Sequence, residues 1–127
     1  LKIDIQTFKQ RLAKMTSGDF DMVAAGWGPD YDDVMTFGDL AASWNLNNRG
    51  RYSNPKYDAL VRKAMSSADP TVRMDAMGKL QQISFDDAVV LPQYEQGIIY
   101  LLHPKVRGVM RRVIGHDPDY TYARVIE

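Results

Sequence analysis

The sequence has 127 residues, within the size of one domain, and its 45% hydrophobic and 25% charged content is typical of a globular protein. Sixteen basic residues balance sixteen acidic ones, which argues against a general attraction to nucleic acid or anionic membranes. The absence of cysteine excludes disulfides, thiolate metal sites and thiol nucleophiles, and no apolar run is long enough to span a membrane.

The N-terminal part of the sequence predicts a β-α-β unit. Residues 3–5 alternate between apolar and polar, as in a short strand. Apolar residues then recur at helical spacing over 8–15, and Gly18 stands where a helix commonly ends. The apolar run at 20–25 reads as a second strand, and a helix between two strands favours parallel pairing.

The middle of the sequence predicts a polar loop followed by two helices. Residues 28–53 are rich in turn formers, with a short helix expected at 38–43 and apolar anchors at Phe37, Leu40 and Trp44. Asn54-Pro55 and Asp69-Pro70 combine an N-cap residue with proline at the first helical position. The apolar faces that we expect to pack together are Tyr57, Leu60, Val61, Ala64 and Met65, and Val72, Ala76, Met77, Leu80, Ile83 and Ser84.

The C-terminal part predicts strands at 88–94, 97–102, 106–113 and 123–126. Together with the preceding helices, these strands give a mixed α/β fold class, and the sequence contains no internal repeat.

One turn concentrates groups suited to binding. Residues 26–33 follow the apolar run at 20–25, and glycine and proline force the chain to turn there. Trp27 offers a flat apolar wall and Asp30 a negative charge, which suits a ligand with a cationic head and an apolar body. Two alternatives stay open from the residues alone: Asp30 could cap the turn, and Trp27 could fill the core.

The sequence gives little support for a metal site or a catalytic site. An EF-hand loop beginning at Asp30 would need glycine where Met35 stands and glutamate where Ala41 stands. Only His103 and His116 could serve zinc, so we expect no metal site and no cofactor. The sequence lacks a Gly-x-Ser-x-Gly elbow and a phosphate-binding glycine loop, and its basic residues form no broad stripe with aromatics for nucleic acid. We therefore expect a protein that is not an enzyme.

An ordered set of segments carries a family resemblance. It comprises residues 25–33, 47–61, 90–94 and 115–118. In this set the sequence resembles the C-terminal part of extracytoplasmic oligopeptide-binding proteins, the solute receptors of peptide ABC transporters (solute-binding protein family 5). Members are several times longer, so the resemblance implies that residues 1–127 are a single fragment of the C-terminal lobe of a two-lobed, periplasmic-binding-protein-like (type II) α/β fold.

The resemblance also implies a binding site. Asp30 matches the family aspartate that pairs with the α-amino group of an extended peptide, and Gly26, Trp27 and Tyr31 lie in the same turn. Tyr94 and Gln96 fall where the family chain turns back toward the cleft, although Tyr94 could equally belong to the core. Ala24 stands where some members have an arginine for the peptide carboxylate, so the sequence does not predict a fixed clamp on peptide length.

The remaining implications concern partners and location. The resemblance implies a bacterial protein of the periplasm or the outer face of the cell membrane, working with a membrane permease, with any export signal or lipid anchor upstream. The tail at 106–127 would pack toward the missing lobe, and its unpaired strand edges would also allow self-association. Alternative hypotheses are a receptor for another solute (a dipeptide, a sugar or a chelated metal) and a protein-interaction module without a ligand.

Overall fold

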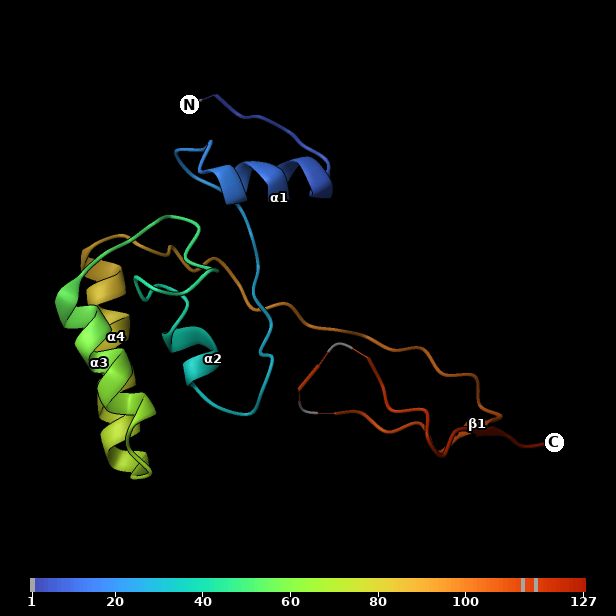
Figure 1. Ribbon diagram of the computed structural model, residues 1–127. Helices are drawn as coiled ribbons and strands as arrows, with labels where there is room; N and C mark the ends of the chain where they lie inside the picture. The colour runs from blue at the N-terminus through green and yellow to red at the C-terminus, as the bar shows by residue number, and fades with distance from the viewer. Residues whose placement is uncertain (1, 113, 116) are drawn as a thin grey trace.

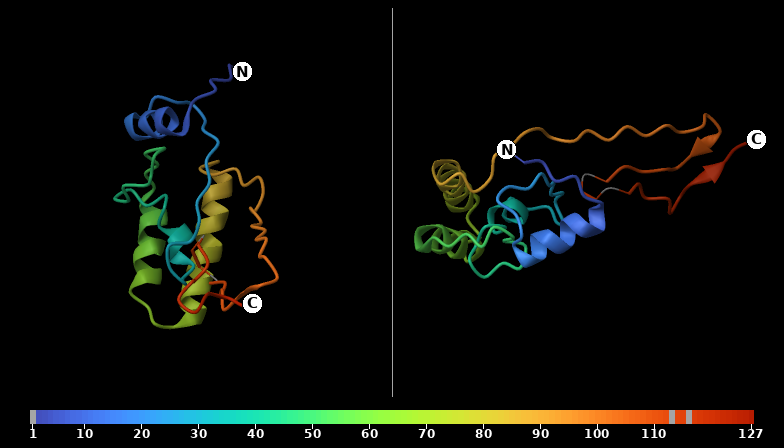
Figure 2. Two further views of the ribbon diagram at one scale, coloured as in Figure 1. Left: turned by 90° about the vertical axis from the view of Figure 1, so that its right-hand side faces the viewer. Right: turned by 90° about the horizontal axis from the view of Figure 1, so that it is seen from above.

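Helices carry most of the regular structure in the computed structural model, which describes residues 2–112, 114–115 and 117–127. In chain order the elements are α1 (Phe8–Ser17), α2 (Met35–Gly38), α3 (Pro55–Met65), α4 (Pro70–Asp86), β1 (Val106–Arg107) and β2 (Arg124–Val125) (Figure 1). Helices α3 and α4 lie side by side, α2 packs against both of them, and the β1–β2 hairpin stands away from this bundle at the end of a long extended segment (Figures 1 and 2).

Both predicted helix starts in the middle of the chain are confirmed. The Asn54 Oδ1 atom accepts a hydrogen bond from the Lys56 N–H at 2.9 Å, and Pro55 is the first residue of α3. The Asp69 Oδ1 atom accepts from the Thr71 N–H at 2.8 Å, and α4 begins at the next proline. Each cap satisfies a backbone donor that the first turn of a helix leaves free.

The core lies where α3, α4 and α2 meet, and it confirms that the two long helices pack as a pair. Its buried apolar residues are Met35, Ala41, Ala42, Tyr57, Val61, Ala64, Ala76 and Leu80. The predicted faces are right except at Met65, which is the last residue of α3 and is exposed. Phe37 and Trp44 are also half exposed rather than anchors, and the Arg62 guanidinium carbon lies 4.3 Å from the centre of the Trp44 ring.

Helix α1 has the predicted position but buries none of its residues. Its start is a capping box between Thr7 and Gln10, and Gly18 ends it with a φ of 81°, a conformation that glycine adopts without strain. Arg49 and Arg51 hold its C-terminal end, donating to the Thr16 hydroxyl at 3.0 Å and the Ser17 carbonyl at 2.8 Å.

The predicted strands at 3–5, 20–25, 88–94 and 97–102 are wrong for the described chain, which runs through these segments without strand pairing. A strand needs a neighbour to take its backbone N–H and C=O groups, and no described segment lies beside these runs in a ladder. The described residues therefore contain no β-α-β unit, and their fold is mostly helical with little sheet.

Two strands at the C-terminal end form, but they are shorter than predicted. Strands β1 and β2 pair antiparallel, with Val106 opposite Val125, and a further bridge joins Met110 to Asp119. The predicted strand at 106–113 ends at Val113, which lies outside the described residues, as does His116.

Candidate functional site

The turn singled out by the sequence connects an extended segment to helix α2. Residues 20–29 run from α1 toward the helical bundle without strand pairing, and the turn at 30–34 leads directly into Met35 (Figure 1). Trp27 is 41% exposed, so it does not fill the core. Tyr31 is also half exposed, which leaves both rings available on the surface of the turn.

Asp33 ties this turn to the helical bundle. Its Oδ1 atom accepts a hydrogen bond from the Met35 N–H at 2.8 Å, and its Oδ2 atom pairs with the Arg73 guanidinium from α4. Arg73 also donates to the Ala64 carbonyl at 2.8 Å, near the end of α3. The turn is thus joined through one arginine to both long helices.

The hydrogen bond between Asp33 and the Met35 N–H fixes the start of α2, which lies earlier than predicted. The short helix was expected at 38–43 and is found at Met35–Gly38, with turns following it. An Asp two residues before a backbone donor forms a local Asx turn, and here the donor is Met35. The hydrogen bond from the Met35 N–H lowers the pKa of Asp33 most, and the Arg73 guanidinium lowers it further against the effect of burial.

Asp30 is held differently, through its backbone. The Asp30 N–H donates to the Thr36 Oγ1 atom at 3.1 Å. Its carboxylate is exposed and has no hydrogen bond or ion pair with any residue of the described ranges. Of the two roles left open by the sequence, turn capping belongs to Asp33, and Asp30 presents a free negative charge.

Tyr31 adds a hydrogen-bond donor beside this charge. Partial burial of the ring raises the pKa of Tyr31. Nearby carboxylates raise it further, in the order Asp39, Asp33 and Asp30, because they repel a phenolate. The Tyr31 hydroxyl therefore keeps its proton at neutral pH, and the turn combines a fixed anion, a neutral hydroxyl and an indole ring.

Gly26 precedes Trp27 in the same turn, whereas Tyr94 and Gln96 lie elsewhere on the surface. Gly26 is exposed, and a Cβ placed there would meet nothing within 4 Å. Tyr94 is 86% exposed and lies outside the core formed by α2, α3 and α4. Within the described residues, no hydrogen bond, ion pair or ring contact joins Tyr94 or Gln96 to residues 26–31. Gln96 instead lines a shallow hollow of about 310 Å³ beside Arg111 and Asp117.

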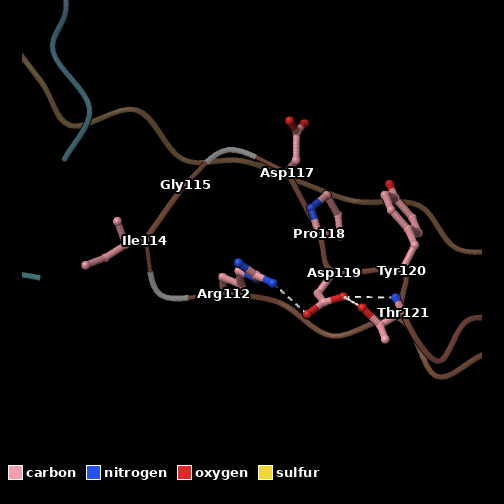
Figure 3. A pocket seen from close by; sticks show the side chains of 8 residues that line it. All are labelled: Arg112, Ile114, Gly115, Asp117, Pro118, Asp119, Tyr120 and Thr121. Carbon is pink, nitrogen blue, oxygen red and sulfur yellow. Dashed lines mark hydrogen bonds and ion pairs between the residues drawn. The ribbon is translucent and has the colours of Figure 1, made fainter. Parts of the chain in front are cut away.

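A larger hollow of about 540 Å³ lies in the loop of the C-terminal hairpin (Figure 3). Its polar groups satisfy one another: Asp119 accepts from the Arg112 guanidinium at 2.8 Å and from the Thr121 N–H at 2.9 Å. The Thr121 hydroxyl and the Arg112 guanidinium hold the pKa of Asp119 far below its usual range. These contacts shape the loop and occupy the Asp119 carboxylate, whereas the Asp117 carboxylate at the rim has no hydrogen bond or ion pair among the described residues (Figure 3).

Sequence reasoning missed Thr36 and Arg73, the residues that hold the turn. Arg73 lies 40 positions from its partner Asp33, so no local pattern joins them. The Asx turn at Asp33 did have a local signal, an aspartate two residues before a helix.

Among the described residues, no helix is long and apolar enough to cross a membrane. Those same residues contain no group of three potential metal ligands.

Comparison with known proteins gives the family. No family model matches the chain. The periplasmic oligopeptide-binding protein OppA of Haemophilus influenzae is 30% identical over 125 residues, covering 98% of this chain and 22% of that protein. A crystal structure from the oligopeptide ABC transporter of Bacillus anthracis (substrate-binding domain) superimposes with a TM-score of 0.82 at 32% identity, over 98% of this chain and 24% of the other.

The chain belongs to solute-binding protein family 5. A second structure of the family, Haemophilus influenzae OppA in complex with the peptide RPPGFSPFR, matches with a TM-score of 0.73 at 30% identity, covering 84% of this chain and 21% of that one. The chain thus spans about a fifth of the length of the family 5 proteins it matches, and the family resemblance found in the sequence is confirmed.

Proposed function

We propose that this chain is part of the substrate-binding component of a bacterial peptide ABC transporter, which binds extended peptides through their α-amino group and backbone. The observation that carries the proposal is the Asp30 carboxylate. It is exposed and has no hydrogen bond or ion pair with the described residues, while Thr36 holds the Asp30 backbone N–H. The oligopeptide-binding relatives support the substrate class, and the periplasmic one supports a location outside the cytoplasm. The proposed role is binding without catalysis.

The chemistry of the turn suits a peptide N-terminus. A peptide ammonium group that leaves water needs an anionic partner, and a charge-assisted hydrogen bond is worth about 1.5–3 kcal/mol. Asp30 supplies the anion, the Tyr31 hydroxyl a donor for a peptide carbonyl, and the Trp27 ring an apolar wall. Gly26 has no side chain to keep a peptide backbone away. Tyr94 and Gln96 are proposed as secondary contacts to the bound peptide.

The exposed extended segments support a place within a larger receptor. Residues 88–102 present large apolar side chains to solvent, among them Leu91, Tyr94, Ile99 and Leu101. Exposed apolar runs with free backbone groups mark surfaces that other segments cover. We assign residues 1–127 to the C-terminal lobe of a two-lobed receptor, in which other parts of the receptor chain pair with these runs and the tail at 106–127 packs toward the other lobe.

Such a receptor works by differential affinity. Peptide bound between two lobes stabilises the closed state over the open one, and the closed state then serves a membrane permease. One lobe supplies only part of the peptide's surroundings, so tight binding requires both lobes.

The test compares Asp30→Asn with Asp32→Asn in the receptor that carries this chain. Asp32 is a matched control because it is an exposed aspartate of the same turn. Isothermal titration with RPPGFSPFR should show affinity about ten- to a hundredfold weaker for Asp30→Asn, roughly 1.4–2.7 kcal/mol, and close to wild type for Asp32→Asn. N-acetylation of the peptide should weaken its affinity for the wild-type receptor by a similar factor. No binding by wild type, or equal affinity for the free and acetylated peptides, would contradict the amine-anchor function.

A further inference from the structure

Thr36 occupies an unusual place for a polar side chain. It lies in the four-residue helix α2 and is 3% exposed, between Met35 and Gly38, which are also buried. Its Oγ1 atom accepts the Asp30 N–H at 3.1 Å. One buried hydroxyl thus joins the core to the backbone of the residue whose carboxylate faces solvent.

Helix α2 gives this hydroxyl a fixed position. The Tyr57 hydroxyl of α3 donates to the Gly38 carbonyl at 2.8 Å. The Met77 side chain of α4 is so close to Gly38 that an added Cβ would lie 3.0 Å from the Met77 sulfur atom. Asp33 holds the start of α2 through the Met35 N–H. The helix is therefore held at both ends, and Thr36 cannot shift without disturbing these contacts.

The remaining contacts of the turn do not hold Asp30 itself. Asp33 and Arg73 fix the chain three residues further on, and the Asp30 side chain has no partner among the described residues. Within those residues, the hydrogen bond to Thr36 is the contact that ties the Asp30 backbone to the core.

We propose that Thr36 is a positioning residue for the ligand-binding Asp30: its hydroxyl holds the Asp30 amide, and thereby directs the Asp30 carboxylate toward the peptide ammonium group. This inference rests on the proposed function and adds the residue that orients its anchor. A preorganised carboxylate binds more tightly because the cost of ordering the turn is met during folding rather than during binding.

Thr36→Val and Thr36→Ser separate this role from packing. Valine has nearly the shape of threonine and the same branching at Cβ, but it cannot accept the Asp30 N–H. Serine keeps the hydroxyl and loses the methyl group. Thr36→Val should therefore release Asp30, whereas Thr36→Ser should retain it.

The measurement is the ratio of dissociation constants for N-acetylated and free RPPGFSPFR in the receptor that carries this chain. We expect a wild-type ratio of about tenfold or more. The ratio should fall to about threefold or less in Thr36→Val and return to the wild-type value in Thr36→Ser. A merely structural role would weaken both peptides equally and leave the ratio unchanged.

Amide hydrogen exchange in the unliganded protein gives a second readout. The Asp30 amide should be protected in wild type and Thr36→Ser and unprotected in Thr36→Val, because only the hydroxyl accepts it. This measurement on wild type remains decisive if Thr36→Val does not fold: an unprotected wild-type Asp30 amide overturns the inference.

The outcomes distinguish the two proposals. If wild type prefers the free peptide over the acetylated one and Thr36→Val keeps the same ratio, the positioning role is overturned and the proposed function stands. A wild-type ratio near one overturns the amine anchor itself, and the positioning role with it.

Discussion

Replacement of Leu80 by alanine tests the core directly. The Leu80 side chain is 1% exposed where α4 faces α3. Leu80 and Val61 are the largest fully buried side chains of the described residues, and several of their buried neighbours are alanines. Few other side chains there can expand to fill a void. We expect Leu80→Ala to be more damaging than a typical substitution.

The magnitude follows from what is removed. Leucine to alanine deletes three carbon atoms, and about 0.8 kcal/mol per buried carbon gives a transfer cost of about 2.4 kcal/mol. The unfilled cavity adds to this cost, so the free energy of unfolding should fall by about 3–4 kcal/mol, within the range known for buried leucines. That loss is a large share of the stability of an ordinary domain.

Urea denaturation followed by far-ultraviolet circular dichroism measures the change, since α3 and α4 supply most of the helical signal. Leu46→Ala is the matched control: the chemical change is identical, but Leu46 is 91% exposed in a loop. The control should stay within about 0.5 kcal/mol of wild type. Equal losses for the two variants, or none for Leu80→Ala, would refute the assignment of the α3–α4 interface as the core.

Two further predictions concern a buried carboxylate and a glycine that lies close to the facing backbone. Burial raises the pKa of Asp58, but the Ser43 hydroxyl and N–H hold its oxygens at 2.6 and 2.9 Å, and the net pKa is lowered. This stabilisation is complete above the usual aspartate pKa of about 3.9 and is lost as pH falls through the folded-state value. In acid, the free energy of unfolding should therefore fall less steeply with pH in Asp58→Asn than in wild type. Identical dependence on pH in the two proteins would contradict the reasoning. Gly108 has a φ of 78° and an added Cβ would lie 1.9 Å from the Tyr122 carbonyl oxygen, so Gly108→Ala should remove amide protection from the β1–β2 hairpin. Gly97→Ala, where nothing lies within 4 Å, should not; protection retained in both variants would show that the hairpin accommodates the side chain.

The helices could be predicted because their signals are local. Asn54 and Asp69 cap helices that begin at the next residue, and Gly18 ends α1 with a left-handed backbone. Each signal acts over one helical turn, between atoms only a few residues apart. The apolar faces of α3 and α4 were predictable for the same reason, since helical spacing places their members on one side.

The strands could not be predicted from local signals. Residues 88–94 and 97–102 have the composition of strands, yet the described chain leaves them unpaired. Apolar alternation indicates that a segment can pair, but only a neighbour with free backbone groups makes it a strand.

The candidate site, too, was predicted in part from local sequence and depends in part on contacts between distant residues. By itself, the sequence determined that a turn carrying Trp27 and Asp30 follows an extended run, and its family resemblance pointed to Asp30 as the anchor. Only the tertiary structure decided that Asp33 binds the Met35 N–H and the Arg73 guanidinium. The Asp30 carboxylate has no partner among the described residues, and the Asp30 backbone is held by Thr36. The physical reason is that composition places several equivalent carboxylates in one turn, and what distinguishes them is the position of partners such as Arg73, which folding brings from 40 residues away.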